Sequence, residues 1–171
     1  MQNFDNGAER PAKSYHGLMK AAVVLIALCG AAICVFWFPY GVSSGMPALA
    51  ETGGREYWTA FASECVFFYL AALPCFVIAG YLWKVSDLVR EGRLFSAAGV
   101  RCFHRSAVIL FFDLIFFLFG NIVFARMGLN GWFWLYIFLT LCGAAVALLF
   151  FVVAKCLGEA AKLQEESDGT I

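Results

Sequence analysis

The stretch that decides the fold of this chain is WKVSDLVREGRLFSAAGVRCFHR, residues 83–105. It is the only long polar interval in the middle of a strongly apolar sequence. On each side of it lie two apolar runs, which are separated by a short connection with little charge. The pattern predicts two membrane hairpins joined by a basic loop. The basic residues of that loop are Lys84, Arg90, Arg93, Arg101 and Arg105.

The composition supports a membrane protein. Of the 171 residues, 63% are hydrophobic and 14% are charged, whereas a soluble domain has about 45–50% apolar and about 25% charged residues. A soluble fold of this length could not bury so much apolar surface, so the excess is expected to face the lipid bilayer. The formal net charge is zero, which argues against direct binding of nucleic acid through bulk electrostatics.

Four apolar runs have lengths close to the roughly 20 residues that cross a ~30 Å hydrocarbon core as a helix. The predicted fold class is therefore all-α: a polytopic membrane protein with four transmembrane helices in two hairpins. The expected helices are residues 18–40, 58–83, 106–124 and 132–154, within a membrane domain 18–155. The expected polar parts are an N-terminal arm 1–17, the central loop 84–105 and a C-terminal helix or tail 156–171.

The distribution of lysine and arginine predicts the orientation. Ten of the twelve basic residues lie in the arm with Lys20, in the central loop or in the tail, and only Arg55 and Arg126 lie in the other two connections. Because loops rich in lysine and arginine stay in the cytoplasm, both termini and the central loop are predicted to be cytoplasmic. The chain is accordingly expected to be a multi-pass protein of the plasma membrane.

Polar residues inside the apolar runs are the candidates for intramembrane function. Glu64 and Asp113 each cost roughly 2.5–3.5 kcal/mol at the centre of a bilayer. Asn121 follows Asp113 by eight residues and is expected at the depth of Glu64, so a hydrogen bond between Asn121 and Glu64 is predicted. Pro74 cannot donate a hydrogen bond to the Leu70 carbonyl, which predicts a kink.

These carboxylates allow two interpretations. Buried acids mark proton and ion pathways in transporters, so the chain could be a small proton- or cation-coupled transporter. They also form interhelical contacts that set the register of a bundle. We favour the second interpretation, because Glu64 and Asp113 are expected at different depths and few other polar residues accompany them.

Catalytic and metal-binding patterns are absent from the sequence. The seven cysteines include no CxxC pair, and no histidine lies at metal-ligand spacing from a pair of cysteines, so the cysteines are interpreted as small apolar residues at helix contacts. The chain contains no GxSxG, HExxH, P-loop or dinucleotide-binding motif. We therefore expect a protein that is not an enzyme and has no cofactor or metal.

The C-terminal segment AKCLGEAAKLQEES, residues 154–167, is polar but favours a helix. Its charges lie at spacings that stabilise a helix protruding from the membrane, and such a helix is a candidate docking element. The alternative is that it only caps the fourth run. The candidate docking residues are Glu159, Lys162, Glu165, Glu166 and Asp168. Small residues in the first and fourth runs would also allow close helix contacts and a homo-oligomer.

Three features resemble a known family: Pro74 within the second run, the loop VSDLVREGRLFSAAGVRCF and the ending GEAAKLQEESDGTI. They are similar to features of the bacterial domain-of-unknown-function 2975 family of four-helix integral membrane proteins, and the similarity extends from the second run to the C-terminus. Gly169 stands where that family usually has an apolar residue.

The resemblance implies a membrane protein that is often encoded beside a small Cro/C1-type helix-turn-helix regulator, and it implies no established activity. The function expected from it is that of a non-enzymatic regulatory or sensory partner, which tethers such a regulator through its tail and central loop. The alternatives are the small coupled transporter and a structural subunit of a membrane complex.

Overall fold

The computed structural model describes residues 9–44, 54–129 and 131–168, and this part of the chain is helical except for short turns. It contains four helices that are long and apolar enough to cross a membrane. The all-α class predicted from the sequence is thereby confirmed, as is the prediction of four helices with the length and composition of membrane spans. The elements are α1 (Glu9–Ala32), the π-helix η1 (Ile33–Trp37), α2 (Phe38–Ser44), α4 (Arg55–Arg90), α5 (Ala97–Arg126) and α6 (Phe133–Asp168).

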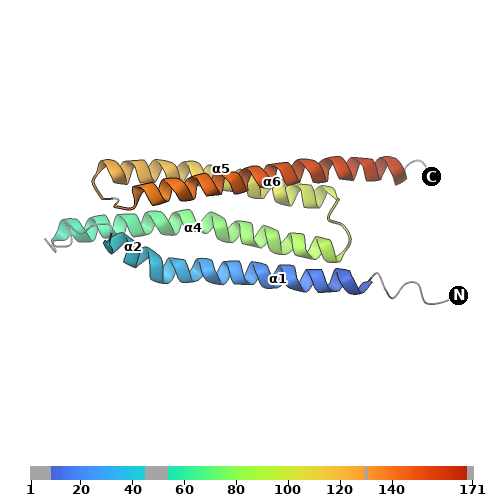
Figure 1. Cartoon of the computed structure of the whole chain (residues 1–171), viewed down its shortest axis with the longest axis horizontal. Coiled ribbons are helices and arrows are strands. Elements are labelled where there is room, and N and C mark those ends of the chain that lie inside the picture. Colours follow the sequence, from blue (N-terminus) through green and yellow to red (C-terminus); the bar gives the residue numbers. More distant parts are fainter. Residues whose placement is uncertain (1–8, 45–53, 130, 169–171) are drawn as a thin grey trace.

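The long helices lie lengthwise beside one another (Figure 1). α1 packs on α4, α4 on α5 and α5 on α6, so α4 and α5 join the pair α1/α4 to the pair α5/α6. Among the described elements, α1 does not pack on α5 or α6. We call the end of the bundle at which α1 begins and α6 finishes the terminal end, and the other the opposite end.

The first helical segment differs from the expected run 18–40 at both ends. α1 begins at Glu9, inside the segment 1–17 that the sequence set apart as a polar arm; residues 1–8 lie outside the described part of the chain. Pro11 occupies its first turn, where the backbone N–H groups have no acceptor within the helix, so the N–H that proline lacks is not needed. At the other end, Pro39 does not stop the chain, because helix α2 continues to Ser44.

The π-helix η1 ends two residues before Pro39 and contains Val35, which is four positions before the proline. In an α-helix the Val35 carbonyl would need the N–H that proline lacks. A π turn pairs a carbonyl with the amide five residues later, which for Val35 is the amide of Tyr40. The wider turn is thus a physical reason why the helix can pass through Pro39.

Glycines in the left-handed region end two of the long helices. α4 ends at Arg90, and Gly92 has φ +68°; the Arg93 N–H then donates to the Leu88 carbonyl at 2.9 Å. This is the glycine C-terminal motif that satisfies the last free carbonyls of a helix. α4 thus continues beyond the expected boundary at residue 83 into the segment 84–105 that was expected to be a loop. Gly128, with φ +72°, has the same conformation after α5. By contrast, α4 continues without interruption through Pro74.

The contact between α4 and α5 depends on a glycine at the opposite end. A Cβ atom at Gly120 would overlap the ring of Phe67, so this ring lies directly against the α5 backbone. The Phe67 ring also stacks on Phe117, with centroids 5.9 Å apart and an interplanar angle of 17°. Phe67 and Phe68 belong to a buried cluster that Leu129 and Tyr136 extend toward α6.

A second buried cluster, of Val85, Leu88 and Cys102, joins α4 to α5 at the terminal end. There α6 is still packed: Ala154 and Leu157 are buried, and the Gly158 backbone lies beside Val100 of α5. α6 has 36 residues and is about 54 Å long, which greatly exceeds a hydrocarbon core of about 30 Å.

Replacement of Gly120 by alanine is expected to destabilise the protein by about 1–3 kcal/mol, the usual cost of overpacking a filled interior. The added methyl group would force the Phe67 ring away from α5. The measurement is the thermal unfolding temperature of the purified protein in detergent.

The matched control is Gly80→Ala, because a Cβ atom at Gly80 would meet nothing within 4 Å and alanine favours a helix over glycine. The control should be neutral or stabilising. An equal effect of both substitutions would contradict the assigned role of Gly120.

Candidate functional site

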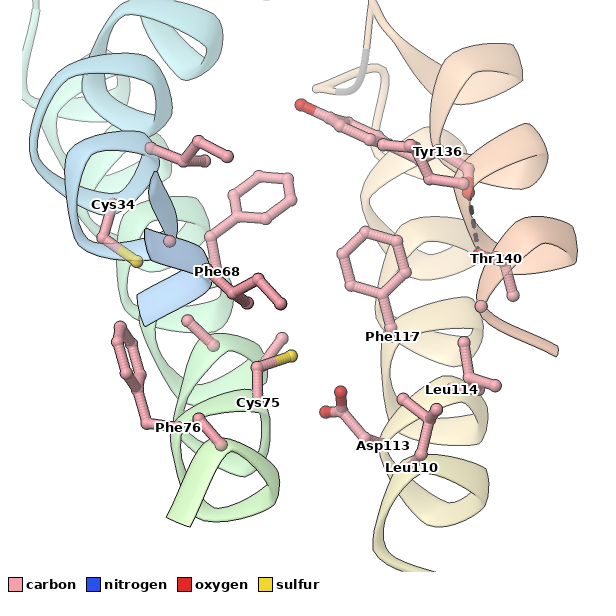
Figure 2. A pocket seen from close by; sticks show the side chains of 18 of the residues that line it. Cys34, Phe68, Cys75, Phe76, Leu110, Asp113, Leu114, Phe117, Tyr136 and Thr140 are labelled. Carbon is pink, nitrogen blue, oxygen red and sulfur yellow. Dashed lines mark hydrogen bonds between the residues drawn. The ribbon is translucent and has the colours of Figure 1, made fainter. Parts of the chain in front are cut away.

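A cavity of about 530 Å³ lies between the pair α1/α4 and the pair α5/α6. On one side it is lined by residues of α1, η1 and the middle of α4, and on the other by residues of α5 and α6. Figure 2 shows these two walls facing each other. Along α4 the cavity lies between the two buried clusters, from Phe68 to Ala79. Its volume is that of a small-molecule site.

Among the described residues that line the cavity, Asp113 is the only charged one. Its carboxylate points from α5 into the cavity, toward the wall that carries the Cys75 thiol (Figure 2). In the part of the chain that the structure describes, no hydrogen bond or ion pair involves this carboxylate. The cavity therefore contains an acidic group that has no partner among the described side chains.

The remainder of the lining is apolar and partly aromatic. Phe68 of α4 faces Phe117 of α5 and Tyr136 of α6 across the cavity, whereas the ring of Phe76 lies on the α1 side of α4 (Figure 2). Thr140 Oγ1 donates to the Tyr136 carbonyl at 2.7 Å, so this hydroxyl is already used within α6. The arrangement can hold an apolar body between aromatic rings and place one negative charge beside it.

Small residues create the space on the α1 side. Ala27 and Gly30 of α1 and Cys34 of η1 line the cavity, although the sequence predicted that small residues of this run would allow a close helix contact. A Cβ atom at Gly30 would only reach ordinary van der Waals distance from Phe76, 3.8 Å. On the other wall the space near Gly143 is filled by the side chain of Leu114. Small residues thus form a cavity wall in one helix and a close contact in another.

Glu64 and Asn121 are buried outside the cavity lining, with exposed fractions of 3% and 1%. Asn121 Nδ2 donates to the Phe117 carbonyl of its own helix at 2.7 Å. The predicted hydrogen bond between Asn121 and Glu64 is not present among the described residues. The physical reason is that a helical asparagine can satisfy its amide on the preceding turn. Glu64 lies close enough to Tyr136 for an electrostatic interaction.

The charged candidates at the terminal end are on the surface. All five basic residues of the central loop are exposed, and Arg93 forms an ion pair with Glu91 at 3.5 Å. Glu159, Lys162 and Glu166 are exposed on α6. The side chains of Glu165 and Asp168 lie outside the described residues.

A polar contact between the start of α1 and the end of α4 was missed by the sequence reasoning. His16 Nδ1 lies 2.8 Å from the Ser86 carbonyl oxygen, and the Ser86 hydroxyl donates to the His16 carbonyl at 3.3 Å. Lys20 Nζ lies 2.8 Å from Asp87 Oδ1 and 4.6 Å from the centre of the Trp83 ring. His16 and Lys20 are one helical turn apart, as neighbouring contacts with one helix require. The four-residue spacing of His16 and Lys20 was the signal in the sequence from which this contact could have been found.

Replacement of Ser86 by alanine should lower stability by about 1 kcal/mol, the net value of a typical buried hydrogen bond, because the fully buried hydroxyl links α4 to α1. The control is Ser63→Ala: the exposed Ser63 hydroxyl donates only to Ala60 of its own helix. Thermal unfolding in detergent checks this expectation. Equal unfolding temperatures for the two variants would show that the contact contributes nothing specific.

The comparisons with known proteins identify one family. No curated protein and no solved structure matches the chain. The family model described as "Protein of unknown function (DUF2975)" matches residues 49–171. The match includes α4, α5 and α6, whereas the α1 and η1 wall of the cavity precedes it. Because the match spans well over half of the chain, the protein belongs to the DUF2975 family, as the resemblance of its loop and tail indicated.

Proposed function

We propose that this chain is a non-enzymatic regulatory membrane protein that tethers a small cytoplasmic helix-turn-helix regulator at its terminal end. The observation that carries the proposal is the length of α6, which runs without a break from the cavity wall to Asp168. A span of about 20 residues would suffice to cross the hydrocarbon core. The last turns of α6 therefore form a rigid polar helix that is available for contact with a protein.

The surface of these last turns supports docking. Leu163 is 66% exposed and lies on the same face as Glu159 and Glu166, at spacings of four and three residues. A large apolar side chain between charges is a usual anchor in a helix-in-groove interface. Leu157, one and a half turns earlier, is instead buried against the bundle. The packed part of α6 thus gives way to a part with an exposed leucine.

The proposed orientation places the terminal end in the cytoplasm. By position in the sequence, this end holds ten of the twelve basic residues, and the opposite end holds Arg55 and Arg126. An excess of lysine and arginine retains a loop on the cytoplasmic side. The chain would then form two membrane hairpins in the plasma membrane with both termini inside the cell, and its exposed central loop could contribute to docking.

A coupled transporter is the second candidate, and Asp113 is the observation that favours it. Its carboxylate faces a cavity rather than a packed interface, as expected for an ion-coupling acid. Against this candidate, the described lining offers few other polar groups, and Glu64 is not among them. Regulation remains the preferred proposal.

The orientation predicts which thiols a membrane-impermeant maleimide can reach. Cys156 is exposed at the terminal end, and Met127 is 63% exposed at the opposite end. In intact cells that express single-cysteine variants, a cysteine at position 127 should be labelled, whereas Cys156 should react only after permeabilisation. The reverse labelling pattern would invert the proposed orientation.

Tethering predicts a partner that co-purifies with the full chain from its native host. Mass spectrometry should identify a small DNA-binding protein. Removal of residues 156–171 should abolish the interaction. A chain that ends at Gly158 is a sharper test, because it keeps the buried Leu157 and removes the turns that carry the exposed Leu163. Leu163→Ser is expected to weaken capture strongly, since it removes the exposed apolar anchor.

Met127→Ser is the matched control, because it removes a similarly exposed apolar side chain at the opposite end. It should capture the partner as the unmodified chain does. Retention of the partner by the chain ending at Gly158, or the absence of any DNA-binding protein from every sample, would refute tethering by α6.

A further inference from the structure

The cavity between the two helix pairs has features that the tethering function does not use. We propose that it is a binding site for a lipophilic cation, a molecule with an apolar body of drug-like size and a single positive charge. The proposed occupant would place its charge beside Asp113 and its body between the aromatic rings. This inference goes beyond the proposed tethering and does not rest on it.

The size and walls of the cavity fit such a ligand. Its volume of about 530 Å³ is within the range of sites that enclose most of a drug-sized molecule. The rings of Phe68, Phe76, Phe117 and Tyr136 approach it from three helices. Aromatic faces attract cations as well as apolar groups, so the same walls favour both parts of the proposed ligand.

The charge of the lining selects the sign of the ligand. In the lining that the structure describes, Asp113 is the only charged residue, and this lining therefore contains no basic residue. An anionic amphiphile would meet a carboxylate with no compensating cation. A neutral lipid chain would fill the space but leave the Asp113 carboxylate without a partner in a medium that solvates charge poorly. A cation would give the Asp113 carboxylate a partner of opposite charge, so the lining is complementary to a positively charged ligand.

The cavity is accessible from the side. Among the described elements, α1 does not pack on α6, so the two walls are not closed against each other along that flank. In a bilayer this flank faces hydrocarbon, where lipophilic cations accumulate in preference to inorganic ions. The helical wall on this side also contains the π-helix η1, and π turns occur frequently at functional sites.

Tetraphenylphosphonium is a suitable probe, and tetraphenylborate is its control, because the two ions share a shape and differ in the sign of their charge. Equilibrium binding of each ion to the purified full chain in detergent would be measured by dialysis. We expect saturable binding of tetraphenylphosphonium with one site per chain. Tetraphenylborate should not compete for that site.

Two carboxylate variants distinguish an effect of the cavity from an effect of negative charge elsewhere in the membrane helices. Asp113→Asn retains the shape of the side chain and should weaken tetraphenylphosphonium binding by about tenfold or more, as for loss of a close charge pair. Glu64→Gln removes an intramembrane carboxylate that does not line the cavity, and it should leave affinity within about twofold.

A third variant tests the volume. Ala72 lines the cavity from α4, and Ala72→Phe would occupy part of the space and should abolish saturable binding. The unfolding temperature of each variant establishes that it is folded. Unchanged binding by Asp113→Asn, equal binding of the two tetraphenyl ions or the absence of a saturable site in the folded chain would each overturn the proposal. None of these results bears on capture of a cytoplasmic partner.

Discussion

The contact of the Phe67 ring with the α5 backbone at Gly120 determines how the two helix pairs meet. Lipid supplies no hydrophobic force between apolar helices, so association depends on close packing and on the small residues that permit it. Here one glycine admits a ring that also contacts neighbouring phenylalanines of α5. With the second cluster around Val85 at the terminal end, the pairs are joined at two levels. The cavity occupies the level between them.

Much of this fold follows from the sequence alone. Apolar runs of about 20 residues predict helices because a bilayer leaves the backbone no other partners, and four such helices are present. The sequence also contains the signal for the end of α4, because glycine at position 92 can adopt the left-handed conformation that other residues avoid. The passage of the chain through Pro39 was not predictable, because it depends on a π turn. Hydropathy cannot distinguish an interrupted helix from one that continues with altered hydrogen bonding.

The candidate site was predictable only in part. From the sequence, Glu64 and Asp113 are both carboxylates within apolar runs and cannot be told apart. The structure places them in different surroundings. Glu64 is buried beside the aromatic cluster, whereas Asp113 faces open space. Depth along a helix can be counted, but the direction of a side chain relative to another helix depends on the rotation of both. For the same reason, small residues such as Gly30 could not be assigned to a contact or to a cavity wall.

The continuity of α6 has a mechanical consequence. Gly143 lines the cavity and Asp168 ends the helix, so 25 residues, or about 37 Å of helix, separate the two points. A stiff rod of that length acts as a lever arm. A tilt of about 5° at the cavity would displace the far end by roughly 3 Å, about two residues' rise along a helix. Because α6 is packed on α5 as far as Gly158, such a tilt has to move α5 and α6 together, and a small rotation of this pair would be amplified at the end of α6 into a displacement large enough to misalign a docked surface.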